Sequence, residues 1–242
     1  MLSMVVDQVR DPAHDPAWHL ALDEALARTG RAAPVLRVWR NAPSVIVGRF
    51  QDVDRAVDLA GCAEDGIRVV RRATGGAAVY TGPGTLNVTL VLPRGSSRRR
   101  DPRSGAPPGL GELMATAVED LGPPAAALRN GSVRTARLRT RHADLAHAAV
   151  HVVPDGVAAR YIAGEETRPA LGDLTPGATP ERLGAALIAA AEHEFGTVRT
   201  RPPNALERAC RDYLFATRYG DVTWHLMGGA GPSSQAREFT GR

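Results

Sequence analysis

The stretch "RRATGGAAVY", residues 71–80, combines residue types that bind anions with a turn between apolar segments. Two adjacent glycines leave backbone N–H groups accessible and let a ligand approach the main chain closely. A neighbouring arginine can hold a phosphate or a carboxylate through two parallel hydrogen bonds. The Gly-Lys-Ser/Thr of a P-loop and the three-glycine spacing of a dinucleotide fingerprint are both missing. The stretch therefore predicts an anion-binding loop, with a purely structural turn as the alternative that these residues alone leave open.

The composition narrows the chemistry that this chain can support. Its 242 residues are 43% hydrophobic and 5% aromatic, which is typical of a globular protein. All 30 basic residues are arginines, so no mechanism can use a lysine of this chain. Cys62 and Cys210 are isolated and lack metal-type spacing, which favours inert thiols and predicts no metal site.

The positive charge has two interpretations. The net charge of +4 would suit an acidic partner, and the densest basic segment spans residues 94–109. That segment is rich in Ser, Pro and Gly and has no interleaved aromatic residues, so a solvated loop is favoured over a nucleic-acid site. No apolar stretch approaches the roughly 20 residues of a membrane span, and the first residues lack a signal core. We therefore expect a cytoplasmic protein that contacts neither membrane nor nucleic acid.

Apolar periodicity and turn residues predict the order of the elements. Strands are expected at 35–39, 44–48, 67–72, 77–80 and 85–92, a hairpin turning at "PDG" within 148–165, and helices at 15–30, 110–122, 179–196 and 204–219. Because strands and helices do not alternate regularly, the fold class is predicted to be α+β, with a mixed, mainly antiparallel sheet and helices packed against it.

Three segments carry a resemblance to a known family. "HLALDEAL" (19–26), "VWRNAPSVIVGRFQ" (38–51) and "RRATGGAAVYTGPGTLNVTL" (71–90) occur in the order and at the spacing of the lipoate-protein ligase A family. "YGDVTWHLMGG" (219–229) is similar to the closing segment of that family. The resemblance implies a biotin/lipoate protein ligase-like fold. Residues 1–175 would form the catalytic-type domain, and residues 176–242 a C-terminal helical segment packed on it or a small accessory lobe.

The resemblance also implies an activity and a set of site residues. Family members use lipoate or octanoate with ATP and Mg²⁺ to form an acyl adenylate. They pass the acyl group to a lysine of a carrier domain, such as the H protein or a 2-oxoacid dehydrogenase subunit. Trp39 and Asn41 would lie near the acyl pocket, Arg72 would face the acyl carboxylate or phosphate, and residues 75–80 would line the adenylate. The implied ligand-binding set is Trp39, Asn41, Arg72, Thr74, Gly75, Gly76, Ala77, Ala78, Val79, Tyr80, Thr81, Gly84, Asn87 and His147.

The chain departs from the family pattern where the chemistry takes place. Ala77 stands at the third glycine of the loop, and Thr81 and Gly82 replace its histidine and aspartate. The family lysine of a "KISGSA"-type stretch has no counterpart. Its region offers Arg134, Arg137 and Arg139 as catalytic candidates, which keep the charge but differ from lysine in shape and pKa.

Two hypotheses about function remain open from the sequence. The chain is either an active ligase or acyltransferase in which arginine replaces the lysine, or a catalytically inactive acyl-binding or carrier-docking relative. The inactive relative would act together with a partner such as an accessory protein.

Overall fold

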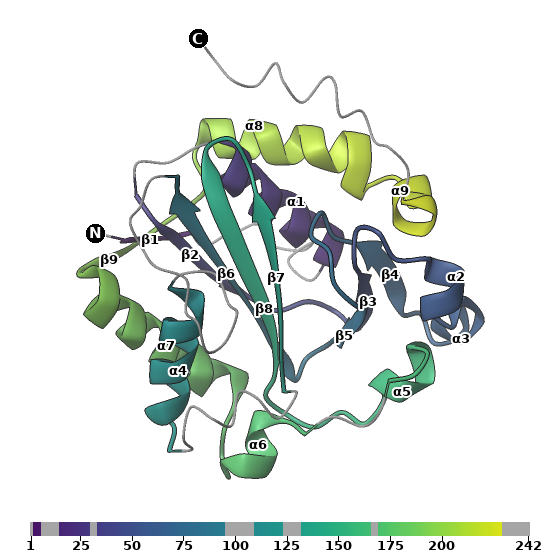
Figure 1. Cartoon of the computed structure of the whole chain (residues 1–242), viewed down its shortest axis with the longest axis horizontal. Coiled ribbons are helices and arrows are strands. Elements are labelled where there is room, and N and C mark those ends of the chain that lie inside the picture. The colour runs from purple at the N-terminus through teal and green to yellow at the C-terminus, as the bar shows by residue number, and fades with distance from the viewer. Residues whose placement is uncertain are drawn as a thin grey trace.

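The computed structural model of the chain describes residues 2–5, 15–29, 33–94, 109–122, 132–165 and 169–228. Within these residues the chain forms two β-sheets side by side, with helices on both faces of the larger sheet (Figure 1). Almost all of the basic loop predicted at 94–109 lies outside the described residues.

The larger sheet contains six strands in the order β7-β8-β6-β2-β1-β9. β6 runs antiparallel to β2 and to β8, and β7 runs antiparallel to β8. β1 is parallel to both β2 and β9. The strands are β1 (Leu2–Val5), β2 (Val35–Trp39), β6 (Thr85–Pro93), β7 (Val133–Arg139), β8 (Ala143–His151) and β9 (Val198–Arg201). The predicted α+β class with a mixed, mainly antiparallel sheet is confirmed.

The smaller sheet has the order β4-β3-β5, with β3 (Ser44–Val47) parallel to β4 (Arg68–Arg71) and antiparallel to β5 (Val79–Thr81). The chain therefore changes sheet twice, between β2 and β3 and again between β5 and β6. The strands predicted at 35–39 and 44–48 both form, but in different sheets. Two short helices, α2 (Val53–Ala56) and α3 (Leu59–Glu64), link β3 to β4.

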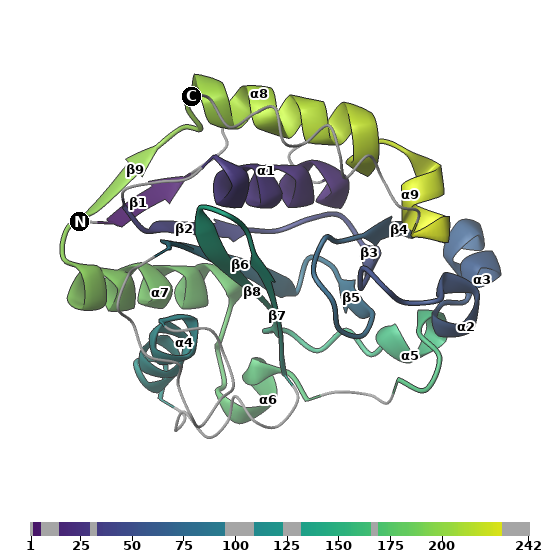
Figure 2. The ribbon, with the colours of Figure 1, turned by 45° about the horizontal axis from the view of Figure 1, so that its top comes forward.

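Helices cover both faces of the larger sheet (Figure 2). α1 (Pro16–Arg28) and α8 (Ala205–Leu214) lie on one face, and α4 (Leu110–Glu119) and α7 (Pro180–Phe195) on the other. The predicted caps are present: the Asp15 side chain accepts the N–H of Ala17 at the start of α1, and the Thr179 side chain accepts that of Arg182 in α7. Each cap satisfies a backbone donor that a helix start leaves without a partner.

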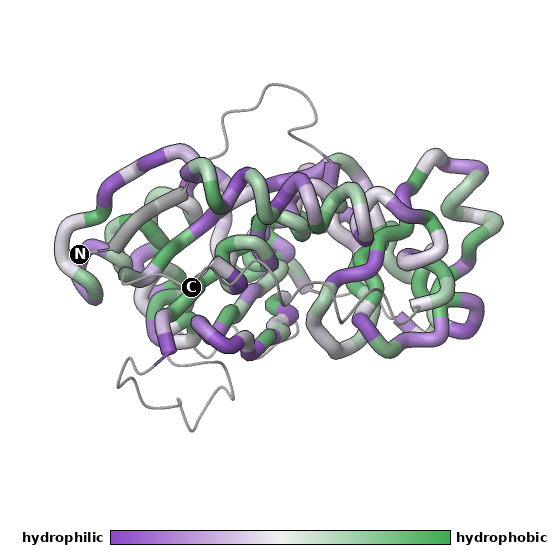
Figure 3. The backbone as a smooth tube through the Cα atoms, turned by 90° about the horizontal axis from the view of Figure 1, so that it is seen from above, coloured by the Kyte–Doolittle hydropathy of each residue, from purple (hydrophilic) through white to green (hydrophobic). Residues whose placement is uncertain are grey.

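The two faces of β6 differ in chemistry. Leu86, Val88, Leu90 and Leu92 pack in the core formed with α4 and α7. The residues between them are also buried and point towards α1, and they include the polar Asn87 and Thr89. Polar and apolar segments alternate along the chain trace in Figure 3, as expected for elements that each bury one face. The buried polar face of β6 is where the candidate site lies.

The predicted hairpin within 148–165 is wrong. β8 ends at His151, and the chain continues through a turn into α5 (Ala158–Tyr161). β8 already pairs with β6 on one side and β7 on the other, so no edge remains for a returning strand. The segment after the turn bonds instead to the helices beside the smaller sheet, where the N–H of Asp58 donates to the carbonyl of Tyr161 at 2.9 Å.

The C-terminal elements join the same layers. After α6 (Leu171–Leu174) and α7, β9 pairs with β1, and α8 packs along α1. The predicted helix at 204–219 is confirmed as α8 followed by a π-helical turn, η2 (Phe215–Tyr219), and α9 (Val222–Met227) comes last. The division of the chain at residue 175 stays a prediction. No helix in the described part of the chain has the length and apolarity needed to cross a membrane.

Candidate functional site

A cavity of about 120 Å³ lies between the α1-covered face of the larger sheet and the loop that precedes β5. Its apolar wall is made by Leu20 of α1, Trp39 of β2, Ile46 of β3 and Val79 of β5. The other lining residues are Arg72, Gly76, Ala77, Asn87, Arg134, Thr135, Ala136, His147, Ala148 and Ala149. Seven of the predicted ligand-binding residues therefore meet here: Trp39, Arg72, Gly76, Ala77, Val79, Asn87 and His147.

The glycine loop is held in place by close backbone contact. A Cβ atom added to Gly48 would lie 1.9 Å from the carbonyl oxygen of Gly76, so only glycine fits at the end of β3. Gly76 has a φ of +97°, a backbone conformation that side chains disfavour. Gly76 and Ala77 are exposed, whereas Thr74 is buried. The loop is thus fixed at its base and open at the cavity.

Arg72 shapes this loop with its guanidinium group. The side chain is 5% exposed and donates four hydrogen bonds to carbonyl oxygens: two to Gly75, one to Ala77 and one to Ile46. Burial lowers its pKa to about 10. Contact of Arg72 with an acyl carboxylate or phosphate stays a prediction, because the side chain lines the cavity while four hydrogen bonds go to the loop and to β3.

Arg71, to which the sequence assigned no role, is the more deeply buried member of the pair. Its guanidinium donates to six carbonyl oxygens, in residues 48, 49 and 51 after β3 and residues 224–226 of α9. Its backbone N–H donates to Nδ1 of His225 at 3.0 Å, and the indole of Trp224 donates to its carbonyl. Arg71 therefore fastens α9 to the loop that supports the glycine turn. A long-range contact of this kind leaves no local pattern in the sequence.

His147 joins β8 to the glycine loop. Its Nε2 lies 2.8 Å from Oγ1 of Thr74. Burial, and then the nearby charge of Arg72, lower the pKa of His147 to about 3. The imidazole is therefore neutral at neutral pH and offers the cavity a hydrogen-bonding group without a charge.

A chain of amides connects the two sheets beside the cavity. Nδ2 of Asn41 donates to Oγ1 of Thr81 and to the carbonyl of Ala42, both at 2.8 Å. Because a carbonyl can only accept, this fixes the orientation of the Asn41 amide, and its Oδ1 accepts from Nδ2 of Asn87 at 2.8 Å. Thr81 is thus a buried acceptor, and of these three residues only Asn87 lines the cavity.

The three arginines of β7 separate by face. β7 and β8 pair Arg134 with Ala149, Ala136 with His147 and Leu138 with Leu145, so the even-numbered residues of β7 share the cavity face. Arg137 and Arg139 point to the opposite face, and Arg139 pairs there with Asp144 at 2.8 Å. Arg134 alone of the three lines the cavity.

The Arg134 guanidinium is a cation that the scaffold leaves available. Among the described residues it forms no ion pair, and partial burial lowers its pKa. The structure therefore narrows the three catalytic candidates to one by geometry, although the role of Arg134 stays a prediction.

Four predicted ligand-binding residues do not line the cavity for structural reasons of their own. Ala78 and Tyr80 face the core of the smaller sheet, where Tyr80 stacks on Tyr161 at 5.8 Å and burial raises the pKa of its phenol to about 12. A Cβ at Gly84 would lie 2.9 Å from the carbonyl of Val153, so this glycine packs a turn. Gly75 accepts from Arg72 within the loop.

A buried polar group beneath Trp39 was missed from the sequence. Arg37 donates to the Asp23 carboxylate and to the carbonyl of His19, and Thr89 donates to Asp23 at 2.7 Å. The His19 ring stacks on Trp39 at 4.6 Å. Burial outweighs the attraction of Arg37 and raises the pKa of Asp23. The sequence signal that could have revealed this network was the presence of the polar residues His19 and Asp23 on the buried, otherwise apolar face of α1. The network holds in place the ring of Trp39, which forms part of the cavity wall.

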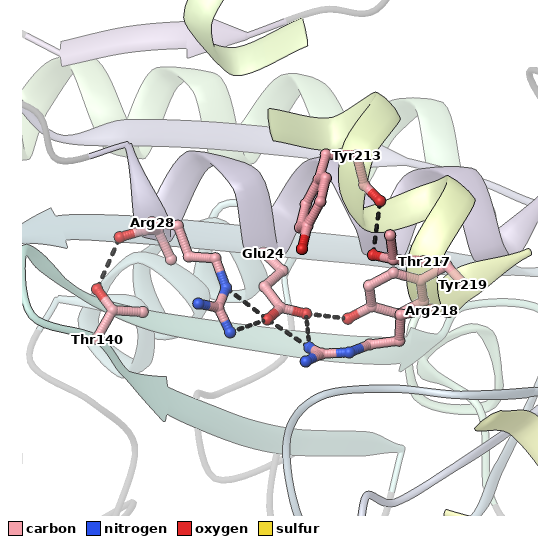
Figure 4. A network of polar contacts seen from close by, with 8 residues as sticks. Glu24, Arg28, Thr140, Tyr213, Thr217, Arg218 and Tyr219 are labelled. Atoms are coloured by element: carbon pink, nitrogen blue, oxygen red, sulfur yellow. Dashed lines mark hydrogen bonds and ion pairs between the residues drawn. The ribbon is translucent and has the colours of Figure 1, made fainter. Parts of the chain in front are cut away.

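Glu24, the next residue along α1, is the centre of a second buried network (Figure 4). Its carboxylate accepts from Arg28, from Arg218 and from the hydroxyl of Tyr219, all at 2.7–2.8 Å. Burial disfavours the charge, but Arg218 and Arg28 outweigh it and lower the pKa of Glu24. Figure 4 shows these groups converging from α1 and η2, so the network ties the helix above the cavity to the C-terminal elements. Within the described residues no cluster of three His, Cys, Asp or Glu side chains has the geometry of a metal site.

Comparison with known proteins places this chain in a family. The model of the lipoyl protein ligase A/B catalytic domain matches residues 15–142, more than half of the chain. The chain belongs to this family. The match includes α1, the glycine loop and β7, and the solved structures below agree with the biotin/lipoate ligase-like fold predicted from the sequence motifs.

Two relatives and two solved structures illustrate the likeness. Subunit 1 of lipoate-protein ligase A from Thermoplasma acidophilum is 45% identical over 74 residues, which are 30% of this chain and 28% of the relative. The mitochondrial lipoyl amidotransferase of Mus musculus is 43% identical over 57 residues, 24% of this chain and 15% of the relative. The structure of a bi-partite lipoate protein ligase and its E2 lipoyl domain from Thermoplasma acidophilum has a TM-score of 0.77 at 23% identity, covering 93% of this chain and 95% of that one. Lipoate-protein ligase A bound with ATP has a TM-score of 0.75 at 24% identity, covering 93% and 97%.

The reach of these likenesses is limited. The matched segments span between 15% and 31% of the length of the curated relatives. The structural identities of 23% and 24% show a shared fold alone. Activity, substrates and partners of this chain therefore belong to a proposal.

Proposed function

We propose that the cavity binds an acyl group of the lipoyl or octanoyl type, or its adenylate, for transfer to a lysine of a lipoyl carrier domain. Residues 1–175 would act as the catalytic-type unit, in the cytoplasm, with ATP and Mg²⁺ as co-substrates. Membership of the lipoyl protein ligase A/B family and the apolar wall of Leu20, Trp39, Ile46 and Val79 support this function.

The observation that carries the proposal is the position of Arg134. Arg72 and Arg134 both line the cavity, but the guanidinium of Arg72 donates four hydrogen bonds to backbone carbonyl groups, whereas Arg134 has no ion pair within the described residues. By the sequence resemblance, Arg134 lies in the region that would correspond to the family lysine. An apolar wall with a cation beside it suits a ligand with a hydrocarbon chain and an anionic head. Arg134 would stabilise the negative charge of the carboxylate or phosphate, while neutral His147 and the exposed backbone of residues 76–77 would supply hydrogen bonds.

The names of similar proteins indicate which kind of partner this chain would act on. One structure of similar fold is described as a bi-partite ligase with its E2 lipoyl domain, and another relative is named as subunit 1 of such an enzyme. By analogy, the acceptor of this chain would be a lipoyl carrier domain of the H-protein or 2-oxoacid dehydrogenase type, with an accessory protein as a second partner.

The alternative is a catalytically inactive acyl-binding or carrier-docking relative. Two observations favour it: the chain contains no lysine, and Arg72 spends four hydrogen bonds on carbonyl groups of its own loop and of β3. Such a protein would hold the ligand or the carrier while a partner performs the chemistry.

Calorimetry combined with a pyrophosphate assay separates these functions. The full chain is titrated with lipoic acid, octanoic acid and biotin, each with and without ATP and Mg²⁺, and the same mixtures are assayed for pyrophosphate. Binding of lipoic or octanoic acid with pyrophosphate release supports the ligase. Binding without release supports an inactive acyl-binding relative. If none of the acids binds, the ligase and the acyl-binding relative are both contradicted, and of the proposed functions the carrier-docking relative alone is left.

A further inference from the structure

The outer edge of β7 offers a row of backbone hydrogen-bonding groups. β7 is the last strand of the larger sheet, and no strand of the described residues pairs with its outer side. The N–H of Thr140 donates to Ala143 at 2.9 Å and the N–H of His151 donates to the carbonyl of residue 132 at 2.8 Å. In an antiparallel pair such bonds recur at every second residue. Even-numbered residues of β7 therefore bond to β8, and the N–H and C=O groups of Thr135, Arg137 and Arg139 point outward.

The same edge is basic. β7 has the sequence "VRTARLR", with three arginines and no acidic residue. Arg137 is exposed, and no ion pair is found for it among the described residues. Charged side chains on an edge strand can also serve only to prevent aggregation. A docking role therefore requires a reason for a partner to come to this edge.

The cavity supplies that reason. Arg134, Thr135 and Ala136 of β7 line it, so the edge forms part of its border. A strand added to β7 would lie about 4.8 Å from it, with every second side chain on the cavity face. A lysine at such a position, next to Arg134 and Ala136, would point towards the cavity rather than away from it. The opposite face of the added strand would lie beside Arg137 and Arg139, where acidic side chains would be favoured.

We propose that the edge of β7 is the docking site of the acceptor protein. An extended, acidic segment that carries the acyl-accepting lysine adds to the sheet as a further strand, and strand pairing aims the lysine at the cavity. This inference rests on the proposed function for the identity of the partner. The pairing itself is a separate claim that can be tested whether or not acyl transfer occurs.

Amide hydrogen exchange of the full chain, with and without an unmodified E2 lipoyl domain, tests the pairing directly. The amides of Thr135, Arg137 and Arg139 should exchange more slowly when the domain is added, because they gain partners. The amides of Arg134 and Ala136 already bond to β8 and should change little. Binding of the domain without slower exchange at the odd-numbered positions would overturn the proposal, and so would absence of binding.

Charge reversal provides the second test. Arg137→Glu should raise the KM for the lipoyl domain about tenfold at low salt, with a smaller effect at high salt. Pyrophosphate release should stay unchanged, because Arg137 faces away from the cavity. The matched control is Arg199→Glu, an exposed arginine on β9 at the opposite edge of the same sheet, which should leave both quantities unchanged. Equal effects of the two variants on KM would contradict docking at β7.

The two tests separate this inference from the proposed function. If the wild-type chain releases no pyrophosphate but the odd-numbered amides are protected by the domain, the ligase function fails and the docking site stands. If acyl transfer occurs with a KM that Arg137→Glu does not change, the ligase function stands and the docking site fails.

Discussion

Arginine is used in opposite ways in two regions of this molecule. Around the glycine loop and α1, Arg71, Arg72 and Arg218 are buried, and their guanidinium groups bond to carbonyl oxygens or to Glu24. On β7, Arg134 and Arg137 face outward or into the cavity, and no ion pair is found for either within the described residues. The first group builds the site and the second keeps its charge available. In a chain without lysine, the partners of an arginine therefore say more about its role than its place in a motif.

The largest loss of stability should follow a substitution in the buried network of Glu24, Arg28 and Arg218. Glu24→Ala removes the carboxylate that compensates Arg218 and Arg28, and we expect a loss of about 3–5 kcal/mol in the free energy of unfolding. Urea unfolding followed by circular dichroism measures this loss. Glu181→Ala removes the partner of Arg40 in an exposed ion pair and serves as control, with no measurable change expected. Equal midpoints for the two variants would show that the Glu24 network does not stabilise the fold.

Arg71→Lys should have the next largest effect. A lysine has three donors on one nitrogen and cannot reach the six carbonyl groups that Arg71 serves, so buried acceptors lose their partners. We expect a loss of about 2–3 kcal/mol in the free energy of unfolding. Arg68→Lys, on the same strand but half exposed, is the matched control and should change little. A stability of Arg71→Lys equal to that of the control would mean that the carbonyl cluster does not need the guanidinium.

The sequence predicted the framework of these regions better than their roles. Asp15 and Thr179 mark helix starts through local capping, and the alternation in β6 follows from local periodicity, so both could be predicted. Arg72 lines the cavity, but its contact with a ligand stays a prediction, and its carbonyl partners depend on how the loop folds back on β3. The wrong hairpin after His151 has a similar cause, because a sequence does not show that both edges of β8 are already occupied.

The three candidate arginines of β7 also show that long-range structure cannot be predicted from local sequence. The sequence could not separate Arg134 from Arg137 and Arg139, because the separation depends on the register of β7 against β8. Once the register is known, the strand period of two decides which side chains face the cavity.

The pH dependence of stability tests whether the imidazole of His147, which lies at the cavity near Arg72, stays neutral in the folded protein. The folded-state pKa of His147 is about 3, below the ordinary value of 6.5. As the pH falls below 6.5, His147 becomes protonated in the unfolded chain but stays neutral in the folded chain. The free energy of unfolding therefore decreases between pH 6.5 and about 3. His147 should contribute about 1.4 kcal/mol per pH unit to this loss. In His147→Gln the fall in unfolding free energy from pH 6.5 to 5 should be less steep than in the wild type, and an identical slope would contradict a neutral His147 in the folded state.

The smallest effect on stability should come from the arginine that matters most for the proposed chemistry. Arg134→Ala removes an exposed side chain without an ion pair among the described residues, so the free energy of unfolding should change by less than about 0.5 kcal/mol. Pyrophosphate release with lipoic acid and ATP should nevertheless fall by about 100-fold, because the cavity loses the cation that would meet the developing negative charge. Arg134→Lys keeps the charge, so it should retain most of the activity. Arg137→Ala, which changes an arginine of the same strand that points to the opposite face, should leave pyrophosphate release unchanged. If Arg134→Ala and Arg137→Ala release pyrophosphate at the same rate, the face of β7 on which an arginine lies does not decide its role. The proposed difference between arginines that build the site and arginines that keep their charge available for a ligand would then be wrong for β7.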